Sequence, residues 1–322
     1  MNLDRFARIS ALTLAVASSF ASHSVFAAKP TLAPTEKWAL VDVSQFFLHN
    51  PPFSFTGLYR SQGMATDGEQ WFFSWQYGLE RADDAFNSIQ RNSSVDIVNG
   101  APSLNPGIPA DLLSQGFDHI GDIDYKDGII YASLDTTNGY TNGHVALYSA
   151  SDLSYTGKVY ELVGAPANPH HDVASWVAVD REEDVGYGKE WQNGNTLNVY
   201  RLEDWRFDHT LTLDASLKNI QGAKVWGKWI YMSSDNDTRS IYRANLRTGH
   251  VEELFQLPQP VGSLEVEGIA LRQSEDGTLD MYVEMIVDPN NSDQSFTDTA
   301  LNVSLYHYRR VTGKRHESHK SH

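Results

Sequence analysis

The segment "IQGAKVWGKWIYMSSDNDTRSIYRANLRTGHVEELFQL", residues 220–257, decides the fold, because four strand patterns follow one another in it. The first two lie within 220–235, the third within 240–247 and the fourth within 250–257. Each alternates apolar with polar residues and is rich in aromatic or β-branched side chains, and short polar turns such as "RTG" separate them. This arrangement predicts four antiparallel strands joined by hairpins.

Four other segments share this plan of a small-residue start, a short apolar strand, a charged or glycine turn and a second strand. They are "SQGMATDGEQWFFSWQ" (61–76), "HIGDIDYKDGIIYASLD" (119–135), "ASWVAVDREEDVGYGKEW" (174–191) and "VEGIALRQSEDGTLDMYVEM" (266–285). Four-stranded units that recur at intervals of roughly 45–60 residues are typical of propeller blades. The sequence therefore predicts an all-β fold, a single five-bladed β-propeller. Six blades is the alternative, because residues 87–116 are long enough to hold a degenerate blade.

The two ends of the propeller are predicted to meet in one sheet. The fifth unit ends after its third strand at "SLYHYRRV", residues 304–311, while "KWALVDVSQFF", residues 37–47, is a strand pattern without a blade of its own. A ring that leaves this position empty exposes unpaired strand edges. We therefore expect the N-terminal strand to complete the last blade.

The first residues resemble an export signal. Arg5 and Arg8 precede the apolar run "ISALTLAVASSFAS", which is too short to span a bilayer, and "SVFAA" offers cleavage after Ala27. We predict a signal peptide at 1–27, the propeller at 28–311 and a basic, His-rich disordered tail at 312–322. The mature protein is then secreted or periplasmic.

Composition restricts the partners. The chain has no cysteine, which excludes disulfides and thiolate chemistry, and its formal net charge is −16. Nucleic acid and anionic membranes attract positive proteins, so neither is an expected partner. A small-molecule or carbohydrate ligand and a divalent metal agree better with this charge. We expect a monomer.

Several of these stretches resemble a known family. "SQGMATDG", the segment at 220–257 and "VEGIALRQ" are similar to the five-bladed propellers of plant-type glutaminyl cyclotransferases and, more loosely, of the strictosidine-synthase and gluconolactonase superfamily. The cyclotransferase pattern has an acidic residue before the glycine of the second and fourth blades. Ile120 and Gln221 stand there in this chain, so the resemblance implies the topology and not those acidic residues.

The innermost strands of a propeller line a central channel, and the loops that lead into them converge on one face. The residues just before the strand-one glycine, or at the equivalent position, are predicted to ring this channel mouth. They are Gln62, Ile120, Ser175, Gln221 and Glu267. His119 and Asp122 in "HIGD" and His171 and Asp172 in "PHHD" belong to the same leading segments.

These residue types suit acid–base or metal chemistry. Imidazoles move protons near neutral pH, whereas carboxylate and amide oxygens are ligands for calcium. The candidate catalytic residues are His119, His171 and Glu267, the candidate metal ligands are Asp122, Asp172 and Glu267, and the candidate ligand-binding residues are Gln62, Gln221, Trp75 and Trp191.

The sequence predicts an exported propeller enzyme supported by a divalent metal, with calcium preferred. It would act as a hydrolase or lyase on a small ester, lactone or carbohydrate at the channel mouth. The alternative is a non-catalytic propeller that binds a ligand or a protein through its rim, since motifs such as G-x-S-x-G and H-E-x-x-H are missing.

Overall fold

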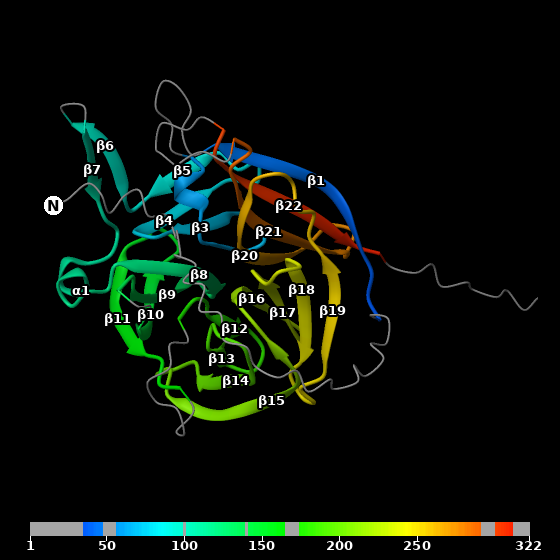
Figure 1. Ribbon diagram of the computed structural model, residues 1–322. Coiled ribbons are helices and arrows are strands. Elements are labelled where there is room, and N and C mark those ends of the chain that lie inside the picture. The colour runs from blue at the N-terminus through cyan, green and yellow to red at the C-terminus, as the bar shows by residue number, and fades with distance from the viewer. Residues whose placement is uncertain are drawn as a thin grey trace, which may run out of the picture.

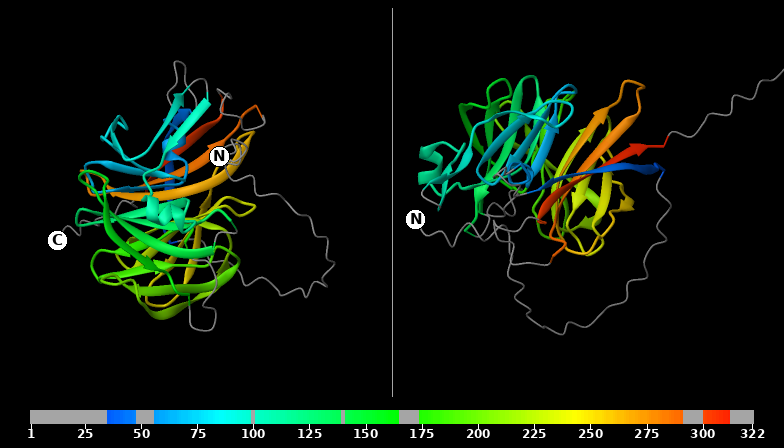
Figure 2. Two further views of the ribbon diagram at one scale, coloured as in Figure 1. Left: turned by 90° about the vertical axis from the view of Figure 1, so that its left-hand side faces the viewer. Right: turned by 90° about the horizontal axis from the view of Figure 1, so that it is seen from above.

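The fold is a five-bladed β-propeller. The computed structural model describes residues 35–47, 56–98, 101–138, 141–164, 174–290 and 300–311. Within these ranges the strands form five four-stranded antiparallel sheets and one two-stranded sheet. The five large sheets are arranged around a central axis, with β8, β12, β16 and β20 near the centre of the view in Figure 1, and Figure 2 shows the ring from two further directions. The predicted fold class and blade number are confirmed.

Each blade is built from strands that follow one another along the chain. Blade one holds β2 (Gly63–Thr66), β3 (Trp71–Trp75), β4 (Gly78–Ala82) and β5 (Ser88–Arg91). Blade two holds β8 (His119–Lys126), β9 (Ile129–Thr136), β10 (Thr141–Ser149) and β11 (Tyr155–Glu161). Blade three holds β12 (Ala178–Asp180), β13 (Val185–Gly188), β14 (Gly194–Arg201) and β15 (Phe207–Leu217). Blade four holds β16 (Ile220–Trp226), β17 (Trp229–Ser234), β18 (Ser240–Asn245) and β19 (Val251–Gln256).

Blade five joins the two ends of the described chain. It has the order β1 (Trp38–Phe47), β22 (Asn302–Arg310), β21 (Leu279–Val287) and β20 (Ser263–Gln273). β1 runs antiparallel to β22, with Trp38 opposite Arg310 and Phe47 opposite Asn302. The predicted closure is therefore confirmed, and β1 covers an edge of β22 that would otherwise be open.

Residues 87–116 do not form a sixth blade. Their described part contains β5, the hairpin of β6 (Ser94–Val98) and β7 (Ala101–Asn105), and the helix α1 (Ala110–Ser114), while a single 3-10 turn, η2 (Leu58–Arg60), precedes blade one. The hairpin projects from the ring beside blade one in Figure 1. This segment thus forms an added hairpin and a short helix between blades one and two. No helix within the described ranges is long and apolar enough to cross a membrane.

The core lies between neighbouring blades. Apolar residues from the faces of blades one and two form one buried cluster, and similar clusters lie between the other blades. Three innermost strands are irregular at their glycines, with register shifts between Ile120 and Ile123, Ile220 and Gly222, and Val266 and Ile269. Such bulges re-aim side chains, and here they turn polar residues toward the axis.

Candidate functional site

The side chain of Asp122 fills the centre of the propeller. A Cβ atom built on Gly63 or on Gly268 would lie 2.5 or 2.8 Å from Asp122 Oδ1, and one on Gly222 would lie 2.8 Å from Oδ2. These three glycines come from blades one, five and four, so the carboxyl group occupies space that larger residues would take. Asp122 therefore divides the axis into a mouth, where the innermost strands begin, and an opposite opening, where they end.

Asp122 is fully buried and ion-paired. Its Oδ2 accepts hydrogen bonds from Lys224 Nζ at 2.6 Å and from the backbone N–H of Ala223 at 3.1 Å, and its Oδ1 accepts one from Met64 N at 3.0 Å. Burial raises the pKa of Asp122 to about 7, and the charge of Lys224 acts in the opposite direction. The pair connects blade two to blade four across the axis. This bonding differs from the metal-ligand role that the sequence suggested for Asp122.

His119 lies at the mouth and is held at both ring nitrogens. Nδ1 is 2.7 Å from Asp135 Oδ1, and Nε2 is 2.8 Å from Gln62 Oε1. Asp135 lies directly opposite His119 on the neighbouring strand β9, whereas Gln62 belongs to blade one. A carboxylate that accepts a hydrogen bond from Nδ1–H fixes the ring orientation and its tautomer. The stretch at 119–135 thus contains a histidine–aspartate pair at the start of β8 and the structural aspartate Asp122 within the same strand.

A second group of polar side chains reaches the mouth from blades three, four and five. Gln221 Nε2 donates a hydrogen bond to Glu265 Oε1 at 2.5 Å, and Gln221 Oε1 accepts one from Trp191 Nε1 at 3.1 Å. Burial raises the pKa of Glu265 to about 7, against the influence of the nearby charges of His119 and Arg239. A carboxyl group with a pKa of about 7 suits proton transfer at neutral pH.

The loop that carries Trp191 is held by a buried lysine. Lys189 Nζ donates hydrogen bonds to the carbonyl oxygens of Glu190 and Gln192, both at 2.8 Å. Burial lowers the pKa of Lys189 to about 8, because desolvation disfavours its charged form. Lys189 thus positions the loop that presents the indole of Trp191 to Gln221.

Two carboxyl groups of blade five have buried oxygens that lack a hydrogen-bond partner in the described part of the chain. Glu267 Oε1 and both carboxyl oxygens of Glu284 are buried, and no donor among the described residues reaches them. Burial raises the pKa of Glu267 well above its ordinary value, and the neighbouring acids Glu265, Glu284 and Asp122 raise it further. Burial likewise raises the pKa of Glu284. Both groups are therefore neutral acids at pH values where an exposed glutamate is ionised.

The structure places the predicted site residues in different surroundings. Gln62, Gln221, Trp191 and His119 gather at the mouth, and Glu267 lies just below them. Trp75 is only 2% exposed and donates its indole N–H to Ser93 Oγ at 2.7 Å, so it packs in the core rather than stacking on a ligand. Ile120 is also a core residue.

The predicted metal centre stays a prediction. Its ligand Asp172 and the candidate catalytic residue His171 lie outside the described residues. Across the part of the chain that the structure describes, no three His, Asp or Glu side chains converge closely enough to hold a metal ion.

Sequence reasoning missed three residues of this site, although the first two carry a signal. Glu265 precedes Glu267 by two residues and Lys224 follows Gly222 by two, so period-two alternation along an innermost strand places them toward the axis. Glu284 gave no such signal, because it lies on β21, the second strand of its blade. It comes close to the axis at the point where β20 has its bulge between Val266 and Ile269.

Comparison with known proteins finds remote structural similarity and no match in sequence. No protein-family profile matches the chain, and no curated protein matches it in sequence. Among solved structures, the chain is similar to the hydrazine synthase of Kuenenia stuttgartiensis (11% identity, TM-score 0.39, 73% of this chain and 57% of that one). It is also similar to AztD of Citrobacter koseri, with 13% identity and a TM-score of 0.33 over 62% of this chain and 47% of that one. The apo form of AztD gives 12% identity and a TM-score of 0.34 over 61% of this chain and 48% of that one. The chain thus spans about half the length of these proteins.

Proposed function

We propose that this propeller is an enzyme that performs acid–base chemistry on a small ester, lactone or carbohydrate at the channel mouth, as a hydrolase or lyase. The observation that carries the proposal is the 2.7 Å contact between His119 Nδ1 and Asp135 Oδ1. An imidazole oriented by a carboxylate is the common form of a general base in enzymes. Glu265, with its pKa raised to about 7, supplies an acid beside it.

The reaction assigns one role to each group. Once the Gln62 side chain turns away from Nε2 and Nδ1–H is donated to Asp135, Nε2 of a neutral His119 accepts a proton from water while the water oxygen attacks the substrate carbonyl. Protonated Glu265 donates a hydrogen bond to the carbonyl oxygen as negative charge develops there. His119 then returns its proton to the leaving alkoxide, so the catalyst is regenerated. In a lyase reaction the same Nε2 removes a carbon-bound proton next to a carboxylate.

The Gln62 side chain can form a hydrogen bond with either charge state of His119. Its Oε1 accepts a hydrogen bond from Nε2–H when the ring is an imidazolium, whereas its amide nitrogen donates one to Nε2 when the ring is neutral, since the two ends of a glutamine amide can exchange places. Gln62 thus supports both forms of His119 that the catalytic cycle needs. Trp191 supports the opposite side by fixing Gln221, which in turn holds Glu265.

The proposal is tested by turnover of a panel of lactones, aryl esters and uronic-acid sugars. For a substrate that the wild-type protein turns over, we expect His119→Ala to lower kcat by about a hundredfold or more, since this is the usual contribution of a general base. Asp135→Asn and Glu265→Gln should also lower kcat, with melting temperatures close to that of the wild-type protein. Glu203→Gln is the matched control, because Glu203 is exposed in the turn between β14 and β15.

The pH profile gives an independent measurement. The rate should fall above about pH 7 as Glu265 loses its proton, and this limb should disappear in Glu265→Gln. Full activity in all three mouth variants would remove these residues from the mechanism. Saturable binding of a panel compound without turnover would instead favour the non-catalytic propeller.

Export is the second part of the proposal. It rests on Arg5, Arg8, the apolar run and the small residues before Ala28, which all lie outside the described residues. Expression of the full chain in a bacterial host should yield a periplasmic protein whose N-terminal residue is Ala28. Recovery of the uncleaved chain from the cytoplasm would contradict this expectation. Calcium support is tested on the same protein by comparing melting temperatures with and without a chelator.

A further inference from the structure

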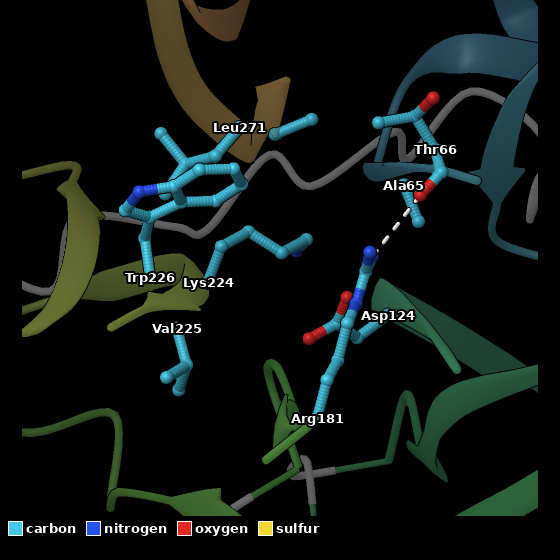
Figure 3. Close-up of a pocket in the computed structure, with 9 residues that line it drawn as sticks. Ala65, Thr66, Asp124, Arg181, Lys224, Val225, Trp226 and Leu271 are labelled. Carbon is cyan, nitrogen blue, oxygen red and sulfur yellow. Dashed lines mark hydrogen bonds between the residues drawn. The ribbon is translucent and has the colours of Figure 1, made fainter. Parts of the chain in front are cut away.

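The opposite opening of the axis forms a pocket that the proposed chemistry does not use. All five blades contribute to it at the ends of their innermost strands, with a volume of about 50 Å³. Its lining includes Thr66, Asp124, Arg181, Lys224, Trp226 and Leu271. Figure 3 shows the Arg181 side chain extending toward Thr66, with the Asp124 carboxylate beside it and Trp226 on the other side of the pocket. Asp122 separates this pocket from the mouth.

Asp124 presents a buried negative charge that is fixed in place. It is only 3% exposed, and its Oδ1 and Oδ2 accept hydrogen bonds from the backbone N–H groups of Tyr125 and Val179, each at 2.8 Å. Each oxygen keeps a further lone pair. Within the described ranges, no lysine or arginine is ion-paired with Asp124, because Lys224 is bonded to Asp122 instead.

Arg181 presents a positive charge to the same space. Its Nη2 donates a hydrogen bond to the carbonyl oxygen of Thr66 at 3.1 Å, and its guanidinium lies 5.6 Å from the ring centre of Tyr125. Arg181 forms no ion pair with a carboxylate of the described chain. Since a guanidinium has five N–H donors, most of those on Arg181 remain available to a ligand.

Asp124 and Arg181 thus line one pocket with opposite charges. Asp124 is bonded to backbone N–H groups and Arg181 to a backbone carbonyl oxygen. Asp124 is buried and Arg181 is exposed beside it, so a ligand that carries both a cation and an anion can pair with the two side chains at once. We propose that this opening binds a small zwitterion, an α-amino acid of about the size of glycine or alanine. Its carboxylate pairs with the guanidinium of Arg181, and its ammonium group pairs with the carboxylate of Asp124.

Single-charge ligands fit this pocket less well. An anion meets the negative charge of Asp124, and a cation meets Arg181 and Lys224, so each is repelled by one wall. A zwitterion satisfies both walls and adds no net charge. The apolar wall of Trp226, Leu271, Ala65 and Ala270 accepts a methyl side chain, and the volume of about 50 Å³ admits only a few heavy atoms.

The test is calorimetric titration of the mature protein with L-alanine and glycine, with acetate and ethylamine as probes that carry one charge each. We expect saturable binding of alanine or glycine and none of acetate or ethylamine over the same millimolar range. Arg181→Gln should weaken binding by about tenfold or more, because it removes the charged donor that pairs with the ligand carboxylate. Arg206→Gln is the matched control, because Arg206 is 64% exposed and lies in a turn of blade three.

Two further variants keep the result decisive. Asp124→Asn should also weaken alanine binding. Because Asp124 is bonded to two backbone N–H groups, the melting temperature of this variant is compared with that of the wild-type protein. His119→Ala should bind alanine with unchanged affinity, because it lies at the mouth. Absence of binding to the wild-type protein, equal binding by Arg181→Gln, or loss of binding in His119→Ala would each overturn the proposal.

Discussion

The ion pair at the centre of the ring allows a sharp test of the structure. Lys224→Met keeps the length and apolar stem of the side chain and removes the cation that lies 2.6 Å from Asp122 Oδ2. The carboxyl group then keeps only two backbone N–H donors, from Met64 and Ala223. Removal of one partner of a buried ion pair typically costs about 3–5 kcal/mol, because the other charge stays buried and uncompensated. We expect the loss to approach that size only well above pH 7, where Asp122 is ionised in the wild-type protein.

The loss should depend on pH. The pKa of Asp122 is raised from 3.8 to about 7 even with Lys224 present, so the contribution of this carboxyl to stability is complete below pH 3.8 and is lost as the pH rises through 7. Without Lys224 the folded-state pKa rises further. The variant therefore continues to lose stability above pH 7, by about 1.4 kcal/mol for each additional unit of pKa shift. The difference between variant and wild type should be small at pH 5 and largest near pH 9.

Urea unfolding followed by tryptophan fluorescence measures this difference, since the chain has 8 tryptophans. Lys228→Met is the matched control, because Lys228 is exposed on the same blade and should cost less than about 0.5 kcal/mol. Asp122→Asn combined with Lys224→Met should recover part of the loss, since it removes the uncompensated charge. A Lys224→Met cost equal to that of the control, or one that does not change between pH 5 and pH 9, would refute the reasoning.

Three other changes test separate parts of the structure. Deletion of residues 35–47 removes β1 and exposes the edge of β22, so most of the stability should be lost, and a melting temperature within a few degrees of the intact protein would rule out this closure. Gly268→Ala should cost about 1–3 kcal/mol, because its Cβ would lie 2.5 Å from the Cα of Gly63, whereas Gly194→Ala meets nothing closer than 3.7 Å and should be nearly neutral in the same unfolding assay. Glu284→Gln should stabilise the protein above neutral pH and less so near pH 4, since the raised pKa of Glu284 makes its contribution fall as the pH rises; a variant less stable than wild type at pH 8 would contradict this.

The sequence determined the architecture because the information for each blade is local. Alternation within 220–257 and its relatives sets the strands, and the short turns between them set the hairpins. Closure was also predictable, because β1 had no blade of its own and blade five had no fourth strand. The position of His119 at the mouth followed from the same register, since residues at the start of an innermost strand share one end of the axis.

Only the tertiary structure decided which polar groups meet. Lys224 and Asp122 are separated by 102 positions in the chain and come from blades that are not consecutive, so no sequence pattern pairs them. Trp75 follows the same strand rules as a mouth residue, yet packing against Tyr59 and a hydrogen bond to Ser93 bury it. The direction of each axial side chain depends on bulges and on the glycines of the facing blades, which are properties of the closed ring. A single strand therefore predicts that a polar residue faces the axis, but its partner is set by all five blades together.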